Sequence, residues 1–388
     1  MPASPSTARA INDRLALELL QQEGPLTAGQ LKTMTGLSRP TVADLVERLQ
    51  ESGLIQVVGE AGAARRGPNA RLYGIVADRA HLAALDVRTE SVSVVVADLL
   101  GTRLAEATLP IGGEAGTGPA VEQAANLVER TARNAGATRL HSVCIGAPGL
   151  IDPASGELRA TTGLPAWHRR LVAALQERLP TGVIVENETN LAAVAEQRLG
   201  IARDRDSFAF LWLGHGVGAG IILDGRLRRG ASGGAGEIGF LPVPGTAAVP
   251  SAVDCDGGFH SLAGSAAICA LGERYGLRGP AAGDHAPPAA AVVAAALAAD
   301  ERAFLDDLAG RLALGAAAVA SVLDPGCVVL GGEVGHAGGD ALAARVEARL
   351  AELSPLRTEV RAGGLGGAAV LSGALLTARE SAQREIFP

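Results

Sequence analysis

One pattern of strands and turns occurs twice in this chain, with starts about 120 residues apart. The first copy runs from His81 as strand, turn, strand, a turn with Asp and Gly, and strand; the second begins at Phe208 and keeps that order. Helical spacing at 120–135 and short apolar strands at 143–145 and 183–186 lie between them. The repeat predicts an α/β protein whose 388 residues include two lobes built on one plan.

The composition is that of a globular protein without a membrane segment. Hydrophobic residues make up 48% and charged residues 19%, and the net charge is 34 minus 41, or −7, which argues against wholesale coating of nucleic acid. No apolar stretch approaches the roughly 18 residues of a membrane span, and the start lacks a secretion signal. Because the four cysteines lie far apart with no CxxC pair, we expect a cytoplasmic protein with free thiols and no membrane partner.

The distribution of charge places a domain boundary near residue 78. Residues 1–78 contain eight basic and eight acidic side chains, so the rest of the chain carries the whole net charge of −7. The apolar pattern also changes there, from short helices to buried strands. We therefore expect three domains, at 1–78, 79–200 and 201–388.

The first domain has the spacing of a small helical fold with two added strands. Helical apolar spacing at 11–20 is followed by a short helix at 28–34 that Thr27 caps, a glycine turn, and a third helix that Ser38 caps. The apolar positions of this third helix follow helical spacing: Val42, Leu45, Val46 and Leu49. A polar loop then separates two short apolar stretches, at 54–58 and 72–76. The order helix, helix, turn, helix and two-stranded wing predicts a winged helix-turn-helix domain.

The third helix and the wing form the candidate DNA-reading surface. In a winged helix-turn-helix, the second helix of the pair enters the major groove by its N-terminal residues, and the wing meets the minor groove or the phosphates. Arg39 has the reach to bind guanine O6 and N7 together, and the others suit phosphate or minor-groove contact. The residues assigned to double-stranded DNA are Lys32, Ser38, Arg39, Thr41, Arg65 and Arg66. The alternative is a protein-interaction domain whose arginines are simply solvated.

Two glycine-rich stretches, 213–220 and 229–239, point to a ligand. Closely spaced glycines expose backbone N–H groups that cradle a phosphate or approach a polar ligand. Spacing by itself leaves the alternative of a glycine-rich hairpin that binds nothing.

From His81 to its end, the chain resembles the ROK family of repressors, open reading frames and sugar kinases. The motifs that carry the resemblance are Gly146-Ala147-Pro148-Gly149, Glu186-Asn187-Glu188, the glycine run at 214–220, Gly236-Glu237-Ile238-Gly239, Leu323-Asp324-Pro325 and Leu330-Gly331-Gly332. Residues 11–76 resemble the winged domain that precedes this module in sugar-responsive repressors. The resemblance implies an actin-like ATPase fold of the ribonuclease H-like class, with a sugar cleft between two lobes and assembly into a homodimer or homotetramer.

The residues at the kinase motifs differ from those of the family's active enzymes. The kinases have Asp-x-Gly-Gly-Thr at the first turn, where this chain has Asp86-Val87-Arg88-Thr89-Glu90. Both glycines are replaced, and Glu90 puts negative charge where phosphates would lie. The catalytic Asp of the kinases corresponds to Glu188, whose carboxylate is one methylene further from the backbone. We therefore expect ligand binding without catalysis and assign no catalytic residue.

The structural zinc site of the family is predicted to be lost. Members that carry it supply one His and three thiolates to a tetrahedral ion. Here the His position is Phe240, and the cysteine cluster is reduced to Cys255 with His260 nearby. One thiolate and one imidazole do not close such a site, so we expect no zinc and no other cofactor.

The resemblance assigns recognition of a sugar effector to five positions at the cleft. They are Asn187, Glu188, Glu237, His260 and the backbone at Gly149. Carboxylates and amides that pair with vicinal hydroxyls orient a small polar ligand. Glu188 and Glu237 have the alternative of acting as structural caps, and His260 that of a surface loop histidine.

These observations lead to one main hypothesis and two rivals. The main hypothesis is a sugar-responsive transcriptional regulator of the repressor type, with an operator-binding head and a catalytically inactive ROK module that binds a sugar or sugar derivative. One rival is an active sugar kinase, transferring phosphate from ATP to a hexose, with an accessory DNA-binding head. The other is a regulator that has lost its small ligand and responds to a protein partner.

Overall fold

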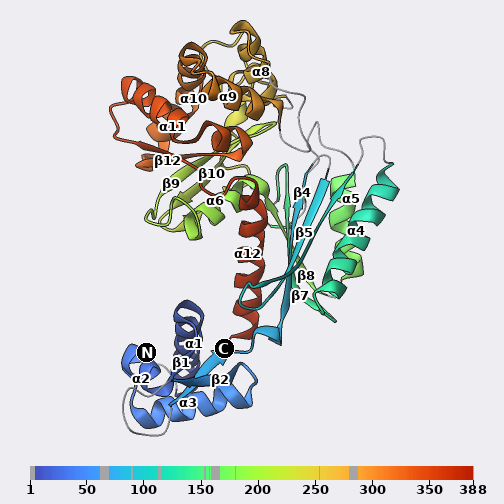
Figure 1. Cartoon of the computed structure of the whole chain (residues 1–388), viewed down its shortest axis with the longest axis vertical. Helices are drawn as coiled ribbons and strands as arrows, with labels where there is room; N and C mark the ends of the chain where they lie inside the picture. The colour runs from blue at the N-terminus through green and yellow to red at the C-terminus, as the bar shows by residue number, and fades with distance from the viewer. Residues whose placement is uncertain are drawn as a thin grey trace.

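The computed structural model consists of a small head and two lobes (Figure 1). The residues described are 5–61, 70–88, 91–111, 116–152, 154–156, 158, 167–179, 181–252, 254–278 and 287–387. Within these ranges, no helix combines the length and the apolar character that crossing a membrane requires. The head lies at one end of the molecule, beside the first lobe (Figure 1).

The head has the predicted winged helix-turn-helix fold. Its helices are α1 (Pro5–Glu23), α2 (Ala28–Thr35) and α3 (Arg39–Glu51), and its strands are β1 (Leu26–Thr27), β2 (Ile55–Ala61) and β3 (Ala70–Ile75). The strands form one sheet in the order β1-β3-β2. Strand β1 is absent from the sequence-based prediction, because two residues are too few to show a strand periodicity. It pairs with β3 and so ties the turn before α2 to the wing.

Caps and apolar spacing fix the helix pair of the head. Thr27 and Gln30 form a reciprocal capping box at the start of α2, and Gly36 ends that helix in the left-handed conformation at φ 72°. Ser38 Oγ then accepts a hydrogen bond from the Thr41 amide at the start of α3. The apolar positions predicted for α3 are all buried: Val42, Leu45, Val46 and Leu49.

The first lobe is built on a five-stranded sheet. Its strands are β4 (His81–Val87), β5 (Ser91–Asp98), β6 (Arg103–Pro110), β7 (Leu140–Ala147) and β8 (Gly182–Asn187), in the order β6-β5-β4-β7-β8. The β4-β5-β6 part is antiparallel, and β7 and β8 add in parallel. Helices α4 (Thr117–Asn134) and α5 (Trp167–Arg178) cover one face of this sheet (Figure 1).

The second lobe repeats this plan, as the sequence pattern predicts. Its strands are β9 (Phe208–Leu213), β10 (Val217–Leu223), β11 (Arg226–Leu227), β12 (Cys327–Gly331) and β13 (Glu359–Ala362), in the matching order β11-β10-β9-β12-β13. Asp224 and Gly225 join β10 to β11 with φ of 55° and 72°, the geometry of a tight hairpin turn. The helices of this lobe are α7 (His260–Ala263), α8 (Ser265–Arg274), α9 (Pro288–Ala298), α10 (Arg302–Leu323) and α11 (Gly332–Leu353).

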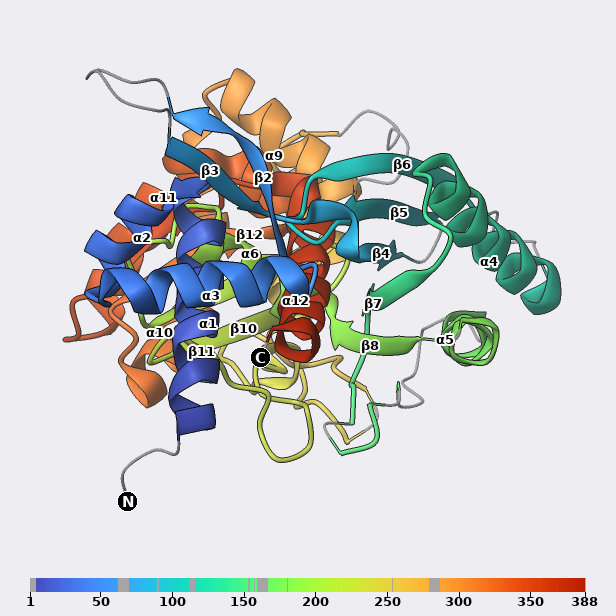
Figure 2. The same ribbon diagram turned by 90° about the horizontal axis from the view of Figure 1, so that it is seen from below.

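Two further helices, α6 (Glu188–Arg198) and α12 (Ala369–Ile386), join the lobes. Although α12 comes last in the chain, it lies along the first-lobe sheet on the face opposite α4 and α5 (Figures 1 and 2). Its buried Val370 and Ala374 share a core with Leu82 of β4 and with Leu191 of α6. The helices approach so closely that a Cβ on Gly373 would lie 2.0 Å from the Leu191 carbonyl oxygen.

The far end of α12 reaches the junction with the head. Phe387 is buried in the apolar core that also contains Ile75 of the head and Leu99 of the first lobe. The Leu99 amide donates to the Ala77 carbonyl at 2.9 Å, and Gln383 Nε2 donates to the Leu99 carbonyl at 3.3 Å. The α12 helix therefore connects α6 with the base of the head, while the domain limits at 78 and 200 stay predictions.

The close packing of α6 and α12 predicts opposite outcomes for two glycine substitutions. Gly373→Ala places a methyl group against the Leu191 carbonyl, so we expect a loss of about 1–3 kcal/mol and a lower Tm. Gly310→Ala, inside α10 where a Cβ meets nothing within 4 Å, should instead add about 0.5–1 kcal/mol. Thermal and urea unfolding measure both. If the two variants unfold alike, the helix contact does not stabilise the fold.

Candidate effector site and DNA-binding surface

The turn between β8 and α6 brings together three of the residues assigned to the effector. Asn187 caps α6, because its Oδ1 accepts hydrogen bonds from the amides of Thr189 (2.9 Å) and Asn190 (3.3 Å). Its Nδ2 group donates to the Gly149 carbonyl at 3.1 Å and to Glu188 Oε2 at 3.2 Å. The cap thus fixes the positions of the Gly149 backbone and the Glu188 carboxyl group.

The negative charge of Glu237 acts on Glu188 at the lobe junction, which is the region between the β8–α6 turn of the first lobe and the glycine-rich segment 229–239 of the second. Burial raises the pKa of Glu188 to about 8, and the nearby negative charges of Asp86 and Glu237 add to that shift. Partial desolvation of its carboxyl group also raises the pKa of Glu237. Asn187, and not Glu188, supplies the N-cap of α6, and Glu237 makes no capping bond to the short helix at Ile238–Phe240.

Glu186 is a residue of this site to which the sequence reasoning gave no role. Its buried carboxylate accepts from the Asn187 amide at 2.9 Å and from Asn190 Nδ2 at 3.0 Å. Its other oxygen pairs with Arg229 Nε of the second lobe at 2.5 Å. Glu186 therefore stabilises the β8–α6 turn through these hydrogen bonds and links β8 to the second lobe through Arg229. Its position in the Glu-Asn-Glu motif was the available signal, but its partner Arg229 is 43 residues away in sequence.

A second ion-pair group crosses between the lobes at Arg88. This residue follows β4, and its Nε donates to Asp86 Oδ2 at 2.9 Å while its NH1 donates to Glu333 Oε1 at 2.7 Å. Glu333 lies in the first turn of α11, in the second lobe. His168 Nε2 lies 3.1 Å from the Arg88 carbonyl oxygen, and burial lowers the pKa of this histidine to about 4. Thr89 and Glu90 lie outside the described residues.

His260 lies on the second-lobe side of the junction, at the start of α7. It is half-buried, and its ring packs against Gly264, where a Cβ would lie 2.9 Å from His260 Cε1. Among the described residues, no hydrogen bond joins His260 to the Asn187, Glu188 or Glu237 side chains. Its role in binding therefore stays a prediction.

No metal centre is found in the described part of the chain. No group of three or more His, Cys, Asp and Glu side chains there has the arrangement of a metal site. Burial raises the pKa of the Cys255 thiol, which disfavours the thiolate that zinc requires. Phe240, at the position where zinc-binding members have His, is 38% exposed. The loss of zinc stays a prediction.

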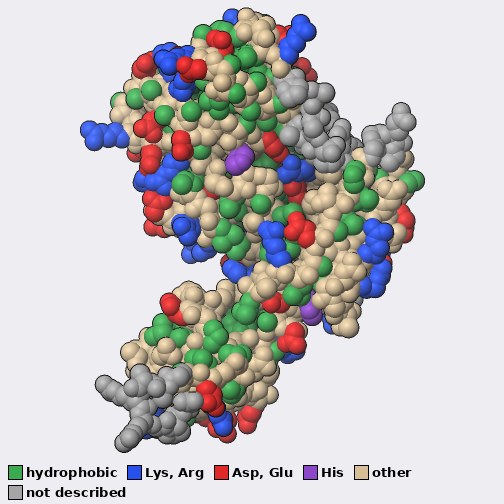
Figure 3. All heavy atoms as spheres, in the orientation of Figure 1, with side chains coloured by type: hydrophobic (Ala, Val, Ile, Leu, Met, Phe, Trp, Pro, Cys, Tyr) green, Lys and Arg blue, Asp and Glu red, His purple; other side chains and the backbone are tan. Residues whose placement is uncertain are grey.

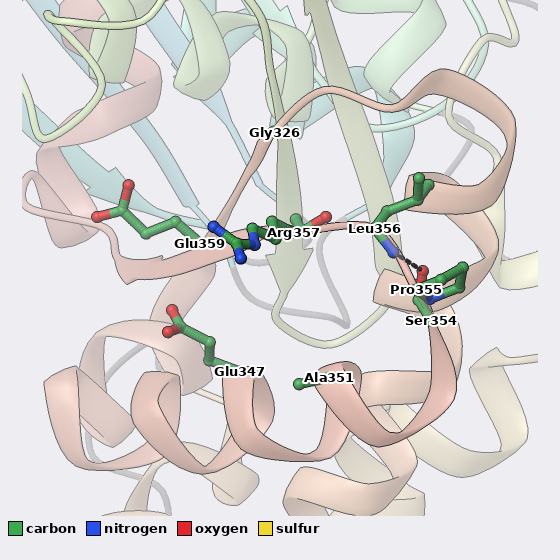
Figure 4. Close-up of a pocket in the computed structure, with 9 residues that line it drawn as sticks. Gly326, Glu347, Ala351, Ser354, Pro355, Leu356, Arg357 and Glu359 are labelled. Atoms are coloured by element: carbon green, nitrogen blue, oxygen red, sulfur yellow. Dashed lines mark hydrogen bonds between the residues drawn. The ribbon is translucent and has the colours of Figure 1, made fainter.

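A surface pocket lies beside Gly326, at the start of β12 (Figure 4). Gly326 precedes β12 and lines this pocket, whereas Glu333 of the Arg88 ion pair follows the end of the same strand. The other lining residues come from α11, β13 and the segment between them: Glu347, Ala351, Ser354, Pro355, Leu356, Arg357, Thr358 and Glu359. The pocket is therefore separate from the residues assigned to the effector.

The head presents the residues assigned to DNA at the start of α3 and at the end of α2. Lys32 and Arg39 are exposed, and neither makes an ion pair within the described ranges. Ser38 and Thr41 also join their hydroxyl groups at 2.8 Å, so they form the cap of α3. In the space-filling view, the head is a protruding unit joined to the lobes by a narrow waist (Figure 3).

The wing contributes the exposed Arg71 to this surface. Arg65 and Arg66 lie outside the described residues. Arg71, at the start of β3, is exposed and lies opposite Glu60 of β2. The sequence reasoning gave Arg71 no role, although its position at the end of the wing loop was a signal. Arg48 of α3 is instead used internally, because it pairs with Asp13 of α1 at 2.6 Å.

Comparison with known proteins identifies the class of the chain. The model of the ROK family matches residues 83–381, and that of the MarR family matches residues 11–66. Because the first match covers well over half of the sequence, the chain belongs to the ROK family. The second match coincides with the winged helix-turn-helix head.

Curated relatives include two regulators. The xylose repressor of Caldicellulosiruptor bescii is 25% identical over 239 residues, 61% of this chain and 59% of that protein. The DNA-binding transcriptional dual regulator NagC of Escherichia coli (strain K12) is 27% identical over 243 residues, 61% of this chain and 58% of that protein. The chain thus spans about 60% of the length of these relatives. A solved ROK family transcriptional regulator, a homologue of the E. coli MLC protein, has the same fold, with a TM-score of 0.75 over 98% of both chains at 21% identity.

The raised pKa of Glu188 predicts a pH-dependent stability. The folded protein holds a proton on Glu188 up to about pH 8, whereas the unfolded chain releases it near the ordinary value of 4.5. The folded state therefore binds more protons between these values, and stability falls as pH rises through that window. Glu188→Gln removes the effect: its Tm should exceed that of the wild type at pH 8.5 by at least about 2 °C, with a smaller gap at pH 5.

Thermal unfolding between pH 5 and 8.5 measures this difference. Glu352→Gln, at an exposed carboxylate on α11, is the matched control and should follow the wild-type profile. Parallel profiles for wild type and Glu188→Gln would show that the Glu188 carboxyl group titrates normally.

Proposed function

We propose that the protein is a sugar-responsive transcriptional regulator of the repressor type. The observation that carries the proposal is the union, on one chain, of a winged helix-turn-helix head with a two-lobed ROK module. The names of the relatives, a xylose repressor and the regulator NagC, support the same class. The effector is a sugar or sugar derivative, and the DNA partner is a double-stranded operator.

The head binds DNA through α3 and the wing. Arg39 is exposed at the first position of α3, where a recognition helix meets the bases, and it is not committed to an ion pair within the described residues. Lys32, in the last turn of α2, and Arg71, on the wing, are also exposed and suit the phosphate backbone. A homodimer or homotetramer supplies the paired heads that a two-fold operator requires.

The effector binds at the junction of the lobes. Asn187 and Glu188 offer amide and carboxyl groups from the first lobe side, and Glu237 offers a carboxylate from the second. Such groups pair with the vicinal hydroxyls of a sugar. Because the site is divided between the lobes, a sugar that contacts both sides favours one lobe arrangement over another.

Arg88 and Glu188 support binding of the ligand without phosphoryl transfer. Transfer requires a phosphate cradle, and the position of the kinase glycines holds Arg88, which pairs with Asp86 and Glu333. Glu188, at the position of the catalytic Asp, has its pKa raised to about 8, so it is largely protonated at neutral pH. The protein accordingly has no catalytic role and uses no metal cofactor.

The structure offers a physical route from the effector to the head. Helix α6 begins at the effector site, α12 packs against α6 at Gly373, and the end of α12 meets the head at Phe387. A change in lobe arrangement that moves α6 therefore moves α12 and the base of the head with it. In an oligomer, this motion alters the spacing of the paired heads and hence their fit to the operator.

The DNA assignment predicts different effects for two head variants. Arg39→Ala should lose about 1–3 kcal/mol of operator binding and relax specificity at one base pair, because a bidentate base contact is removed. Lys32→Ala should weaken binding to all sequences alike and reduce the salt slope by about 1, because a phosphate contact is removed. Gel shifts with operator and mutated operators, repeated at several salt concentrations, separate the two effects. Wild-type operator affinity in Arg39→Ala would remove α3 from the interface.

The effector assignment predicts that Glu237→Ala needs a higher sugar concentration than the wild type to change its operator binding. Loss of a charge-assisted hydrogen bond of about 1.5–3 kcal/mol shifts the sugar midpoint roughly tenfold to a hundredfold. Operator binding without sugar should be unchanged, because Glu237 belongs to the second lobe and not to the head. Fluorescence anisotropy of labelled operator across a sugar titration measures the midpoint, with Glu352→Ala as a control. An unchanged midpoint in Glu237→Ala would take this residue out of the site.

A further inference from the structure

The lobe junction gathers more negative than positive charge. Burial raises the pKa of both Glu188 and Asp86, and negative charges add to each shift: those of Asp86 and Glu237 act on Glu188, and that of Glu333 acts on Asp86. These four carboxyl groups come from β4, α6, α11 and the glycine-rich segment after β11. Because Glu188 is largely protonated at neutral pH, the negative charge comes from Asp86, Glu237 and Glu333. Among the described residues, the cation whose charge acts on both Asp86 and Glu188 is Arg88.

Arg88 is already committed to carboxylates within the protein. Its Nε and NH1 groups bind Asp86 and Glu333, so one positive charge is set against two negative charges. Burial of the Asp86 side chain, which is 5% exposed, makes this interaction strong because solvent does not screen it. The ion-pair group as a whole presents a net negative charge to any ligand at the junction.

Two other basic groups near the junction, Arg229 and His168, add no net positive charge. Arg229 is paired with the buried Glu186, so that pair contributes no net charge. His168 is buried and its pKa is lowered to about 4, so its imidazole is neutral at physiological pH. His168 instead holds the Arg88 backbone through the carbonyl contact at 3.1 Å.

We propose that this site selects an uncharged sugar and rejects phosphorylated ligands, both sugar phosphates and the phosphates of a nucleotide. The inference rests on the proposed function, because it specifies the class of effector that the same site accepts. A phosphate monoester carries a charge of about −1.5 to −2 at pH 7 and requires free N–H donors or unpaired cations. Here the guanidinium at the former phosphate turn is held between Asp86 and Glu333.

The first test uses the wild-type protein and matched pairs of ligands. Glucose, xylose and N-acetylglucosamine are each compared with their monophosphates by calorimetry at pH 7.5, with ATP and pyrophosphate as further probes. We expect at least one uncharged sugar to bind, its monophosphate to bind at least tenfold more weakly, and ATP and pyrophosphate to give no heat of binding. A monophosphate that binds as tightly as its parent sugar, or more tightly, overturns the inference but leaves sugar sensing intact. No binding by any sugar or monophosphate contradicts the proposed function itself.

The second test changes the charge without removing the arginine. Glu333→Gln deletes one of the two negative charges on Arg88, so the ratio of monophosphate to parent-sugar affinity should rise at least fivefold. Glu352→Gln, on the same helix but at its exposed far end, should leave that ratio unchanged. An unchanged ratio in Glu333→Gln would mean that the Arg88 ion pairs do not govern phosphate rejection.

Discussion

The contact between α6 and α12 is the constraint on which the arrangement of this molecule depends. A carbonyl oxygen of α6 occupies the space that a Cβ on Gly373 would need, so the two helices approach at backbone distance. Through this contact, the last helix of the chain is fixed between the lobes and lies along the first-lobe sheet. The N-terminus of α6 lies at the turn that we propose binds the effector, and the C-terminus of α12 meets the head. One packing contact therefore relates the two functional ends of the protein.

Two ion pairs between the lobes complement this helix packing. The Glu186–Arg229 and Arg88–Glu333 pairs both cross from the first lobe to the second, and each has at least one largely buried partner. Breaking a buried pair leaves an uncompensated charge, so these pairs favour the lobe arrangement seen here. In the proposed function, a sugar between the lobes contacts the same groups. We propose that its hydroxyls suit this polar site and that additional negative charge does not.

Much of the fold could be predicted from local sequence, because local forces determine it. The central strands, such as β5 and β9, are apolar runs bounded by turns, and Asp224-Gly225 encodes its hairpin directly. The head followed from the caps at Thr27 and Ser38 and from the apolar spacing of α3. The repeat of one strand plan in two lobes was readable because each copy keeps the same order of strands and turns.

Contacts between segments far apart in the sequence could not be predicted. The return of α12 to the first-lobe sheet leaves no local signal, since an apolar helix face does not specify its partner. Arg88 was recognised as a replaced glycine, but its partner Glu333 is 245 residues away. The grouping of Asn187, Glu188 and Gly149 came from a family resemblance, and the hydrogen bonds of Asn187 supply its physical reason. The short strand β1 was missed because two residues carry no pattern.

We propose that effector and operator act on one shared equilibrium, so their effects on each other's binding are reciprocal. If a sugar weakens operator binding by a given factor, the operator must weaken sugar binding by the same factor. Calorimetric titration of the sugar into free protein and into the protein–operator complex measures that factor from the sugar side. We expect weaker sugar binding to the complex, by the factor found from operator binding with and without sugar. Equal sugar affinity for free and operator-bound protein would show that the two sites are not coupled.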